Sequence, residues 1–143
     1  MPRLPRRFSL FALIPALALA SACADHVTIT GDVIPGTYTA TSFRMTKDGE
    51  PTIDVLAKGG SLTITVAPDL NLTGLLSLPA GVVTPEAATA DMAGVLVVKA
   101  DGNYRFDQPV QSFIKDLTWQ QFTDAFVTTT KMSGVQFQIT LRK

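Results

Sequence analysis

From position 36 onward, apolar and polar residues alternate along most of the chain, which is the pattern of half-buried β-strands. The alternation is cleanest at 135–142, where Phe137, Ile139 and Leu141 fall on one face between polar neighbours. At 37–43 it places Tyr38 and Phe43 on opposite faces. Strands are predicted at 37–43, 52–57, 61–66, 70–78, 95–99, 103–107 and 135–142. The predicted fold class is therefore all-β.

Glycine-containing turns separate these strands. The Asp-Gly steps within 47–50 and 100–103 predict hairpins, because glycine supplies a positive φ beside a turn-forming aspartate. The continuous apolar run at 95–99 predicts a strand covered on both faces. Segment 79–91, rich in alanine, threonine, proline and glycine, predicts a long mobile loop. Loops of this length often serve as lids or binding loops, and a variable insertion without a role is the alternative.

The segment 112–130 fits two structures. As a strand, it places four side chains on one face: Phe113, Lys115, Leu117 and Trp119. As a helix capped by Ser112, it carries a passable apolar stripe. The β-rich surroundings and the threonine run at 128–130 favour two strands that turn near 123–124.

The first 22 residues are a different kind of segment. Positions 1–7 carry three arginines and no acidic residue, 8–20 are almost wholly apolar, and small residues precede Cys23. These three features together are typical of a secretory signal peptide. A transmembrane helix needs about 20 apolar residues, whereas this run is shorter and is broken by Pro15.

The expected cleavage point lies directly before the chain's one cysteine, and Ala-Ser-Ala-Cys at 20–23 resembles a bacterial lipobox. The resemblance implies a lipid on Cys23 that anchors an exported protein to a membrane. Ala24, in place of the aspartate that favours inner-membrane retention, implies the outer membrane, with the domain facing the periplasm. The same stretch also fits an ordinary Ala-x-Ala cleavage site, which predicts a secreted soluble protein.

Composition and motifs exclude several functions. Without the three leader arginines, nine basic residues face 12 acidic ones, and no basic run follows a phosphate backbone, so nucleic acid is not an expected partner. The one histidine, His26, lies before the strand-rich region, which excludes a Ser-His-Asp triad there and leaves no zinc cluster. Neither a Gly-x-Ser-x-Gly motif nor a phosphate-binding glycine loop occurs. We therefore expect no enzymatic activity, no metal and no cofactor.

Gly36-Thr37-Tyr38 opens the series of strands, and this start resembles that of lipocalin-type barrels, whose first strand begins Gly-x-Trp. Segments 113–117 and 133–142 also resemble small bacterial lipocalin-like lipoproteins. The resemblance implies a small antiparallel up-and-down β-barrel of about eight strands, with Arg142 packed over Tyr38 at its closed end. Closure is also expected on physical grounds, because an open sheet would leave exposed edges.

The chain thus divides into a lipoprotein signal peptide at 1–22, a lipid-anchored linker at 23–35 and a barrel domain at 36–143. If the face that carries Lys115 lines the barrel, a cation points into an apolar cup, and an anionic ligand such as a fatty acid would fit there. Alternatively, that face points outward, or the Lys115 side chain snorkels from an end of the barrel. The candidate cavity-lining residues are Tyr38, Phe113, Lys115, Leu117, Trp119 and Phe137.

Two functions from different classes follow from this architecture. The first is a lipid-anchored envelope protein that binds a small apolar or amphipathic ligand inside its barrel. The second is a filled barrel that acts as an envelope scaffold or protein-interaction module without a ligand. A cavity of about 300 Å³ or more inside the barrel would favour the first, and a barrel packed solid would favour the second.

Overall fold

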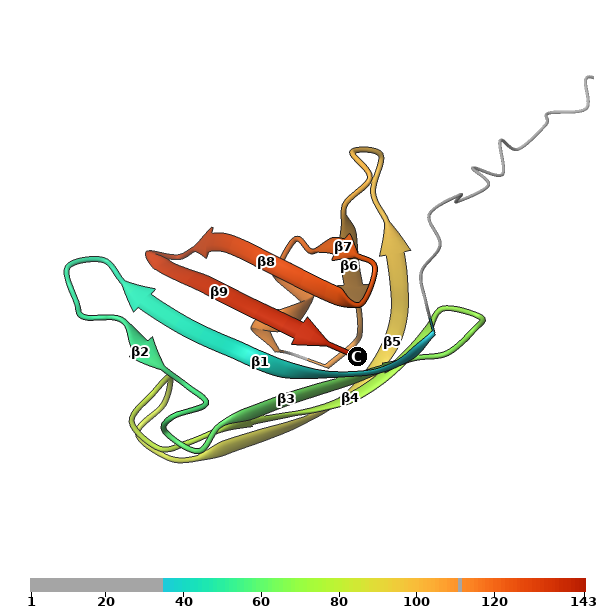
Figure 1. Ribbon diagram of the computed structural model, residues 1–143. Helices are drawn as coiled ribbons and strands as arrows, with labels where there is room; N and C mark the ends of the chain where they lie inside the picture. Colours follow the sequence, from blue (N-terminus) through green and yellow to red (C-terminus); the bar gives the residue numbers. More distant parts are fainter. Residues whose placement is uncertain (1–34, 111) are drawn as a thin grey trace, which may run out of the picture.

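The computed structural model describes residues 35–110 and 112–143. The signal peptide at 1–22, Cys23 and His26 lie outside the described residues, so the predictions about them stay predictions. In the described part, antiparallel strands form one curved sheet that wraps into a barrel (Figure 1). In chain order the elements are β1 (Gly36–Lys47), β2 (Ile53–Asp54), β3 (Ser61–Val66), β4 (Asn71–Leu78), β5 (Ala88–Val98), β6 (Tyr104–Asp107), the 3₁₀ helix η1 (Phe113–Asp116), β7 (Gln120–Phe122), β8 (Ala125–Met132) and β9 (Val135–Arg142).

The strands follow an up-and-down order. Around the sheet they run β6-β5-β4-β3-β1-β9-β8-β7, and the two-residue β2 attaches to β1 beside this path. The first long strand pairs with the last, β1 with β9, so the sheet curls back on itself. This arrangement confirms the predicted all-β fold, an antiparallel up-and-down barrel of eight strands.

The barrel is closed by a single bridge between its two edge strands. Tyr104 of β6 and Trp119, just before β7, form an antiparallel bridge and exchange both backbone hydrogen bonds, at 2.7 and 2.9 Å. We call the end of the barrel that contains this bridge the closed end. The chain enters β1 at this end, where Lys143 Nζ donates to the carbonyl oxygen of Pro35 at 2.7 Å.

At the opposite, open end the two edges of the sheet separate. β6 pairs only with Val95–Val98 of β5, although β5 begins at Ala88. On the other side, β7 reaches no further along β8 than Val127. The segment 112–118 crosses between these edges: Ser112 lies beside the start of β5, and Thr118 bonds to Thr130 of β8. The loop between β4 and β5 and the turn between β8 and β9 form the rim of the open end (Figure 1).

A β-bulge in β1 sets which side chains point inward. The register between β1 and β9 shifts between Ala40 and Ser42, so the inward series passes from Tyr38 to Phe43 instead of keeping strict alternation. Both rings are fully buried, which corrects the prediction that they lie on opposite faces. One extra residue in a strand reverses every later side chain, and alternation alone gives no sign of it.

Aromatic rings fill the closed end of the barrel around Phe126. The Tyr38 ring meets it edge-on at 4.9 Å, and the rings of Tyr104 and Phe106 lie 5.8 and 5.9 Å from it. Trp119 stacks on Phe106 at 4.9 Å. Edge-to-face and offset rings at these distances attract one another beyond their simple burial. The closed end is therefore a packed core.

The strand predictions at 61–66, 70–78, 103–107 and 135–142 are confirmed in place and in inward face. The predicted strand at 52–57 is only β2, because the chain turns at 55–59. The predicted loop at 79–91 ends earlier than expected, since β5 begins at Ala88 and pairs with β4 from that residue. The prediction that 95–99 is covered on both faces is also wrong: Val95 is 44% exposed.

The ambiguous segment 112–130 contains one short helical turn and two strands. Ser112 does act as a cap, because its Oγ accepts a hydrogen bond from the Ile114 N–H, but the helix ends at Asp116. β7 and β8 then follow, with the predicted turn at 123–124 between them. Among the described residues, no helix is long and apolar enough to span a bilayer.

Candidate functional site

A cleft of about 330 Å³ lies at the open end of the barrel. Its walls come from the end of β1, the β1–β2 hairpin, the loop after β4 and the start of β9. Its lining is mainly apolar, with one charged pair: Met45, Lys47, Glu50, Pro51, Ile53, Gly81, Val82, Val83 and Val135. Met45 is 6% exposed and belongs to the core, so the floor of this mouth cleft is continuous with the barrel interior.

The charges of the mouth cleft neutralise each other at its rim. Lys47 Nζ lies 2.7 Å from Glu50 Oε1, and both side chains are exposed. The hydrogen bond that Lys47 donates to Glu50, followed by the attraction of the Glu50 charge, raises the pKa of Lys47 above its usual value. The rim can bind the polar group of an amphipathic molecule through either partner, while the floor accepts its apolar part.

A second cleft, of about 200 Å³, lies between the end of β4, the start of β5 and the start of η1. Leu76 and Leu78 come from β4, Ala90 from β5, and Phe113 from η1, so its lining is mostly apolar. Thr89 and Ser112 each add a hydroxyl group to the lining. This β5 cleft is below the size range of about 300–1,000 Å³ that is typical of small-molecule sites.

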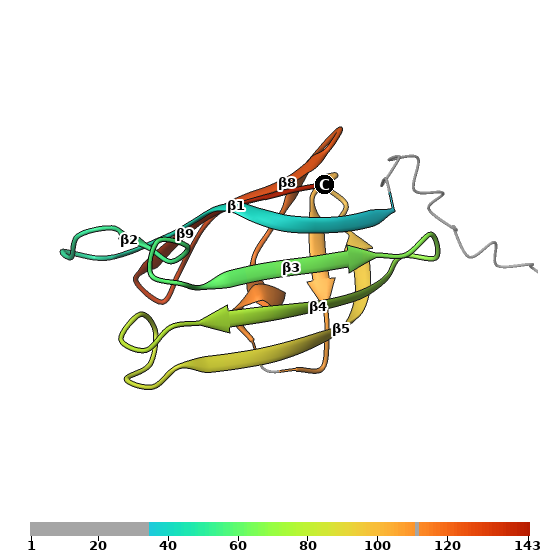
Figure 2. The ribbon, with the colours of Figure 1, turned by 60° about the horizontal axis from the view of Figure 1, so that its bottom comes forward.

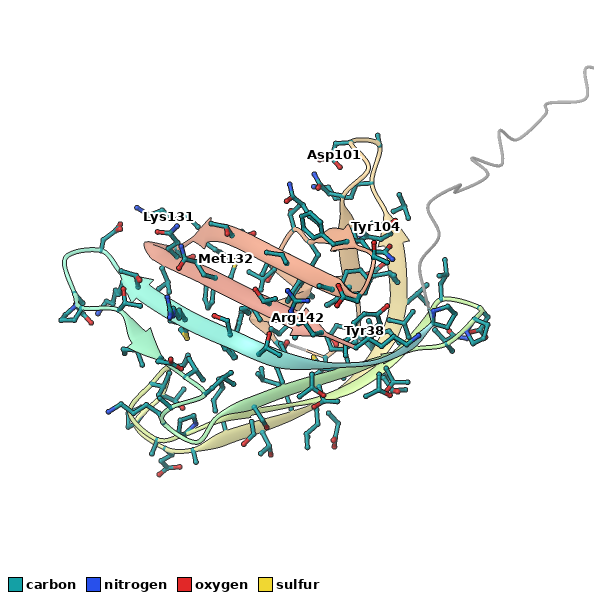
Figure 3. All side chains as sticks on the ribbon, in the orientation of Figure 1. Tyr38, Asp101, Tyr104, Lys131, Met132 and Arg142 are labelled. Carbon is teal, nitrogen blue, oxygen red and sulfur yellow. The ribbon has the colours of Figure 1, made fainter. Side chains whose placement is uncertain are left out.

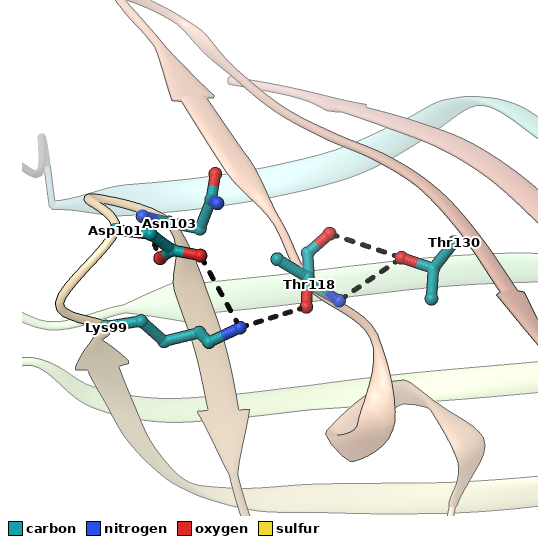
Figure 4. Close-up of polar contacts among 5 residues, drawn as sticks. All are labelled: Lys99, Asp101, Asn103, Thr118 and Thr130. Atoms are coloured by element: carbon teal, nitrogen blue, oxygen red, sulfur yellow. Dashed lines mark hydrogen bonds and ion pairs between the residues drawn. The ribbon is translucent and has the colours of Figure 1, made fainter.

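A third, polar cleft of about 150 Å³ lies beside the closing bridge, where Asn103, Thr118 and Thr130 are among its lining residues. Figure 4 shows the contacts that hold this region. Lys99 Nζ lies 3.8 Å from Asp101 Oδ2 and donates to Thr118 Oγ1 at 3.4 Å. These contacts connect the β5–β6 turn to the segment before β7, which is a structural role.

The residues predicted to line one cup are divided between two places. Tyr38 and Trp119 belong to the aromatic cluster at the closed end, where both are fully buried. Phe137 lies apart from them and stacks on Phe113 at 4.7 Å. Figure 3 shows Tyr38 and Tyr104 at the closed end and Met132 at the far end of β8. Of the predicted residues, Phe113 lines one of the three clefts, the β5 cleft.

The predicted shared strand face of Phe113, Lys115, Leu117 and Trp119 is not formed. Phe113 and Lys115 lie on η1, where one helical turn replaces the alternation of a strand. Lys115 is half-buried, Leu117 is 1% exposed as the residue that caps η1, and Ile114 is buried in the core. The cap at Ser112 and the burial of Ile114 favour the turn over an extended chain. The proposed cationic cup therefore does not exist in the predicted form.

Arg142 also has a different partner from the one that the lipocalin resemblance implied. It pairs with Thr39 of β1 and Ala125 of β8 in register, and its Nη1 lies 2.9 Å from Asp124 Oδ2. Tyr38 remains close enough to Asp124 for that charge, after burial itself, to raise the pKa of the tyrosine.

Sequence reasoning missed the residues of the mouth cleft. Val82 and Val83 are two adjacent apolar residues in an otherwise small and polar loop, and this signal was available in the sequence. The exposed fraction of Val83 is 47%, so it presents apolar surface at the rim. Ile53 was predicted only as a strand residue, and its approach to the loop after β4 depends on the fold.

Among residues 35–110 and 112–143, no group of three or more histidine, cysteine, aspartate or glutamate side chains is placed to hold a metal ion.

The chain matches no protein-family model, and searches of curated proteins and of solved structures found no significant match. Fold and clefts together define a small antiparallel β-barrel with a packed closed end and an apolar cleft at its mouth.

Proposed function

We propose that this chain is a lipid-anchored envelope protein that binds a small apolar or amphipathic ligand at the open end of its barrel. The observation that carries the proposal is the mouth cleft, whose volume of about 330 Å³ falls within the range of small-molecule sites. Its apolar floor and charged rim suit a molecule with one polar group. Because aromatic side chains fill the closed end, the ligand would bind at the mouth and not deep in the barrel.

The resemblance to small bacterial lipocalin-like lipoproteins supports the same proposal. Such a relationship is compatible with the up-and-down barrel and with the start of its first strand at Gly36. The lipobox-like stretch before Cys23 supports a lipid anchor, and Ala24 supports the outer membrane, with the domain facing the periplasm. Since many functions share this fold, the ligand is inferred from the cleft and not from the barrel.

Fluorescent probes test the ligand site. N-phenyl-1-naphthylamine is uncharged and apolar, and 8-anilino-1-naphthalenesulfonate is its amphipathic counterpart. We expect saturable fluorescence enhancement with the full chain and at least tenfold weaker binding by the Val83→Asp variant, because a carboxylate in the cleft is costly to desolvate. Val95→Asp is the matched control: Val95 is similarly exposed, at 44%, but does not line the mouth cleft.

Two results would contradict the ligand site: no saturable enhancement with either probe, or equal losses in Val83→Asp and Val95→Asp. The second candidate function, a filled barrel that acts as a scaffold, would then be favoured. The fully buried aromatic cluster at the closed end is the observation behind that alternative.

The anchor is tested separately. Cells that express the full chain are labelled with a fatty acid analogue, and we expect label on the wild type, none on Cys23→Ser, and release of that variant from membranes. An unlabelled wild type would leave a secreted soluble protein as the better description, without affecting the ligand site.

A further inference from the structure

The first half of β5 forms an open edge of the sheet. β4 pairs with it on one side from Ala88 onward, whereas β6 begins to pair on the other side only at Val95. In Figure 2, this half of β5 is the lowest strand of the sheet, and no strand is drawn beneath it. An exposed strand edge is a template for pairing with another chain.

The register shows which backbone groups this edge presents. The Leu96 N–H donates to the carbonyl oxygen of Leu70 at 2.9 Å, so every second residue of β5, counted from Leu96, bonds to β4. The residues between them, Thr89, Asp91 and Ala93, direct their N–H and C=O groups to the other side. Among residues 35–110 and 112–143, no backbone hydrogen bond reaches these groups from that side.

The edge has a definite length. The Asp107 carbonyl and Gln108 cross over Gly94, where an added Cβ would overlap the Asp107 oxygen. The open stretch is therefore Thr89 to Ala93, roughly 16 Å at about 3.3 Å per residue. That length matches a short strand of five residues.

An apolar recess lies directly beside this edge. The β5 cleft is lined by Thr89 and Ala90 of β5 as well as by Leu76 and Phe113. Its volume of about 200 Å³ is too small for most free ligands but suits one apolar side chain. An open backbone edge with a side-chain recess beside it is the arrangement by which sheet edges bind extended peptides.

A buried polar group at the same place lacks a partner. Gln108 is 5% exposed, and its amide nitrogen donates to Ser112 Oγ at 3.2 Å, while its amide oxygen has no partner among the described residues. If the side-chain amide of Gln108 were rotated by 180°, its nitrogen would lack a partner in place of its oxygen. One buried polar atom is therefore unpaired in either orientation. Ser112 also lines the β5 cleft. A peptide along the edge would bring backbone donors and acceptors close to this amide.

The charges at the edge favour a basic partner. Asp91, in the middle of the open stretch, and Glu86, just before β5, are both exposed. Neither carboxylate takes part in an ion pair with another of the described residues. If the β5 edges of two copies of the chain paired with each other, these acidic side chains would repel one another. A strand that carries lysine or arginine would instead neutralise their negative charge.

We propose that the edge of β5 from Thr89 to Ala93 binds an extended basic segment of a partner protein as an added strand, with one apolar side chain in the β5 cleft. This interaction surface is independent of the mouth cleft and of the ligand proposed there.

A fluorescein-labelled heptapeptide of alternating lysine and valine is the probe, and fluorescence anisotropy with the full chain is the readout. Thr89→Pro removes an N–H that faces the open side and keeps the ladder to β4, so we expect at least tenfold weaker binding. Thr129→Pro makes the same change on the open edge of β8 and should bind as the wild type does. Asp91→Asn should weaken binding at low salt and reduce its salt dependence.

Backbone methylation of the peptide tests the strand geometry on the wild-type protein, where no variant has to fold. One set of alternate peptide nitrogens faces β5, and the other set faces away from it. Methylation of the first set should abolish binding, and methylation of the second set should preserve it.

No saturable binding, equal effects of methylating either set, or equal effects of Thr89→Pro and Thr129→Pro would overturn the proposal. So would a wild-type dimer in sedimentation that Thr89→Pro converts to monomer, because the edge would then pair with a second copy. Val83→Asp should leave peptide binding unchanged, which separates this test from that of the mouth cleft.

Discussion

Tyr104 and Trp119 exchange two backbone hydrogen bonds, at 2.7 and 2.9 Å, and this one residue pair joins the two edges of an eight-stranded sheet. Both side chains are buried beside Phe126 and Phe106 at the closed end. The contacts between the aromatic rings therefore stabilise the bridge, at the place where a single residue pair joins the two edges of the sheet. Closure of the barrel depends on aromatic packing more than on the length of a ladder.

The first prediction concerns Trp119, which is fully buried and stacks on Phe106. Trp119→Ala should lower the free energy of unfolding by about 3–5 kcal/mol, because it leaves a large cavity at the closing bridge. Urea denaturation followed by far-ultraviolet circular dichroism measures the loss. Phe122→Ala, in the neighbouring β7, is the control: its ring is 56% exposed, and we expect a change within about 0.5 kcal/mol. Comparable losses in both variants would contradict this account of closure.

The second prediction concerns Thr130 of β8, whose hydroxyl group bonds to the segment before β7, beyond the point where the β7–β8 pairing ends. Thr130 Oγ1 accepts a hydrogen bond from the Thr118 N–H at 3.3 Å and lies 2.9 Å from Thr128 Oγ1. Thr130→Val keeps the shape but leaves these groups without a partner, so we expect a loss of about 1–2 kcal/mol. Hydrogen exchange of the Thr118 amide should also become faster. Thr129→Val, on the exposed side of the same strand, should change neither quantity. Slow exchange of the Thr118 amide in Thr130→Val would argue against the hydrogen bond between Thr118 and Thr130.

The third prediction concerns Gly94 of β5, where the chain after β6 crosses the strand. A Cβ at this position would overlap the Asp107 carbonyl oxygen, so Gly94→Ala has to displace the crossing segment. We expect a loss of about 1–3 kcal/mol, the usual cost of overpacking. Ala93→Ser, next to it on the exposed side, is the control and should lie within about 0.5 kcal/mol of the wild type. A Gly94→Ala variant as stable as the wild type would show that this segment moves easily.

The fourth prediction is a pH dependence at the β5–β6 turn. Hydrogen bonds from the Asn103 side chain and backbone hold the pKa of Asp101 below its ordinary value of 3.8. A carboxyl whose pKa is lower in the folded state stabilises the fold above its unfolded pKa, and that contribution disappears as the pH falls through the folded pKa. The wild type should therefore be more stable than Asp101→Asn at pH 7, and the two should converge as the pH falls well below 3.8. Parallel thermal unfolding across this range measures the difference; a constant difference would contradict the assignment.

The sequence by itself determined the strands whose pattern is locally regular. The alternation at 61–66 and 135–142 places Leu62, Ile64, Phe137 and Ile139 in the core, as predicted. Turns with Asp-Gly were also predictable, because Gly49 and Gly102 adopt the positive φ that the motif implies. Both features depend only on a residue and its near neighbours, and the up-and-down order follows when consecutive hairpins are joined.

Only the tertiary structure decided the features that depend on distant residues. The bulge after Ala40 turns Phe43 inward because β9 sets the register, and no local pattern records it. The helical turn at 113–116 forms in a segment that alternates like a strand, because Ser112 caps it and Ile114 is buried in the core. The candidate sites are of the same kind. The mouth cleft and the open edge of β5 exist because strands of unequal length meet around a barrel, and strand length against a neighbour is a property of the assembled sheet.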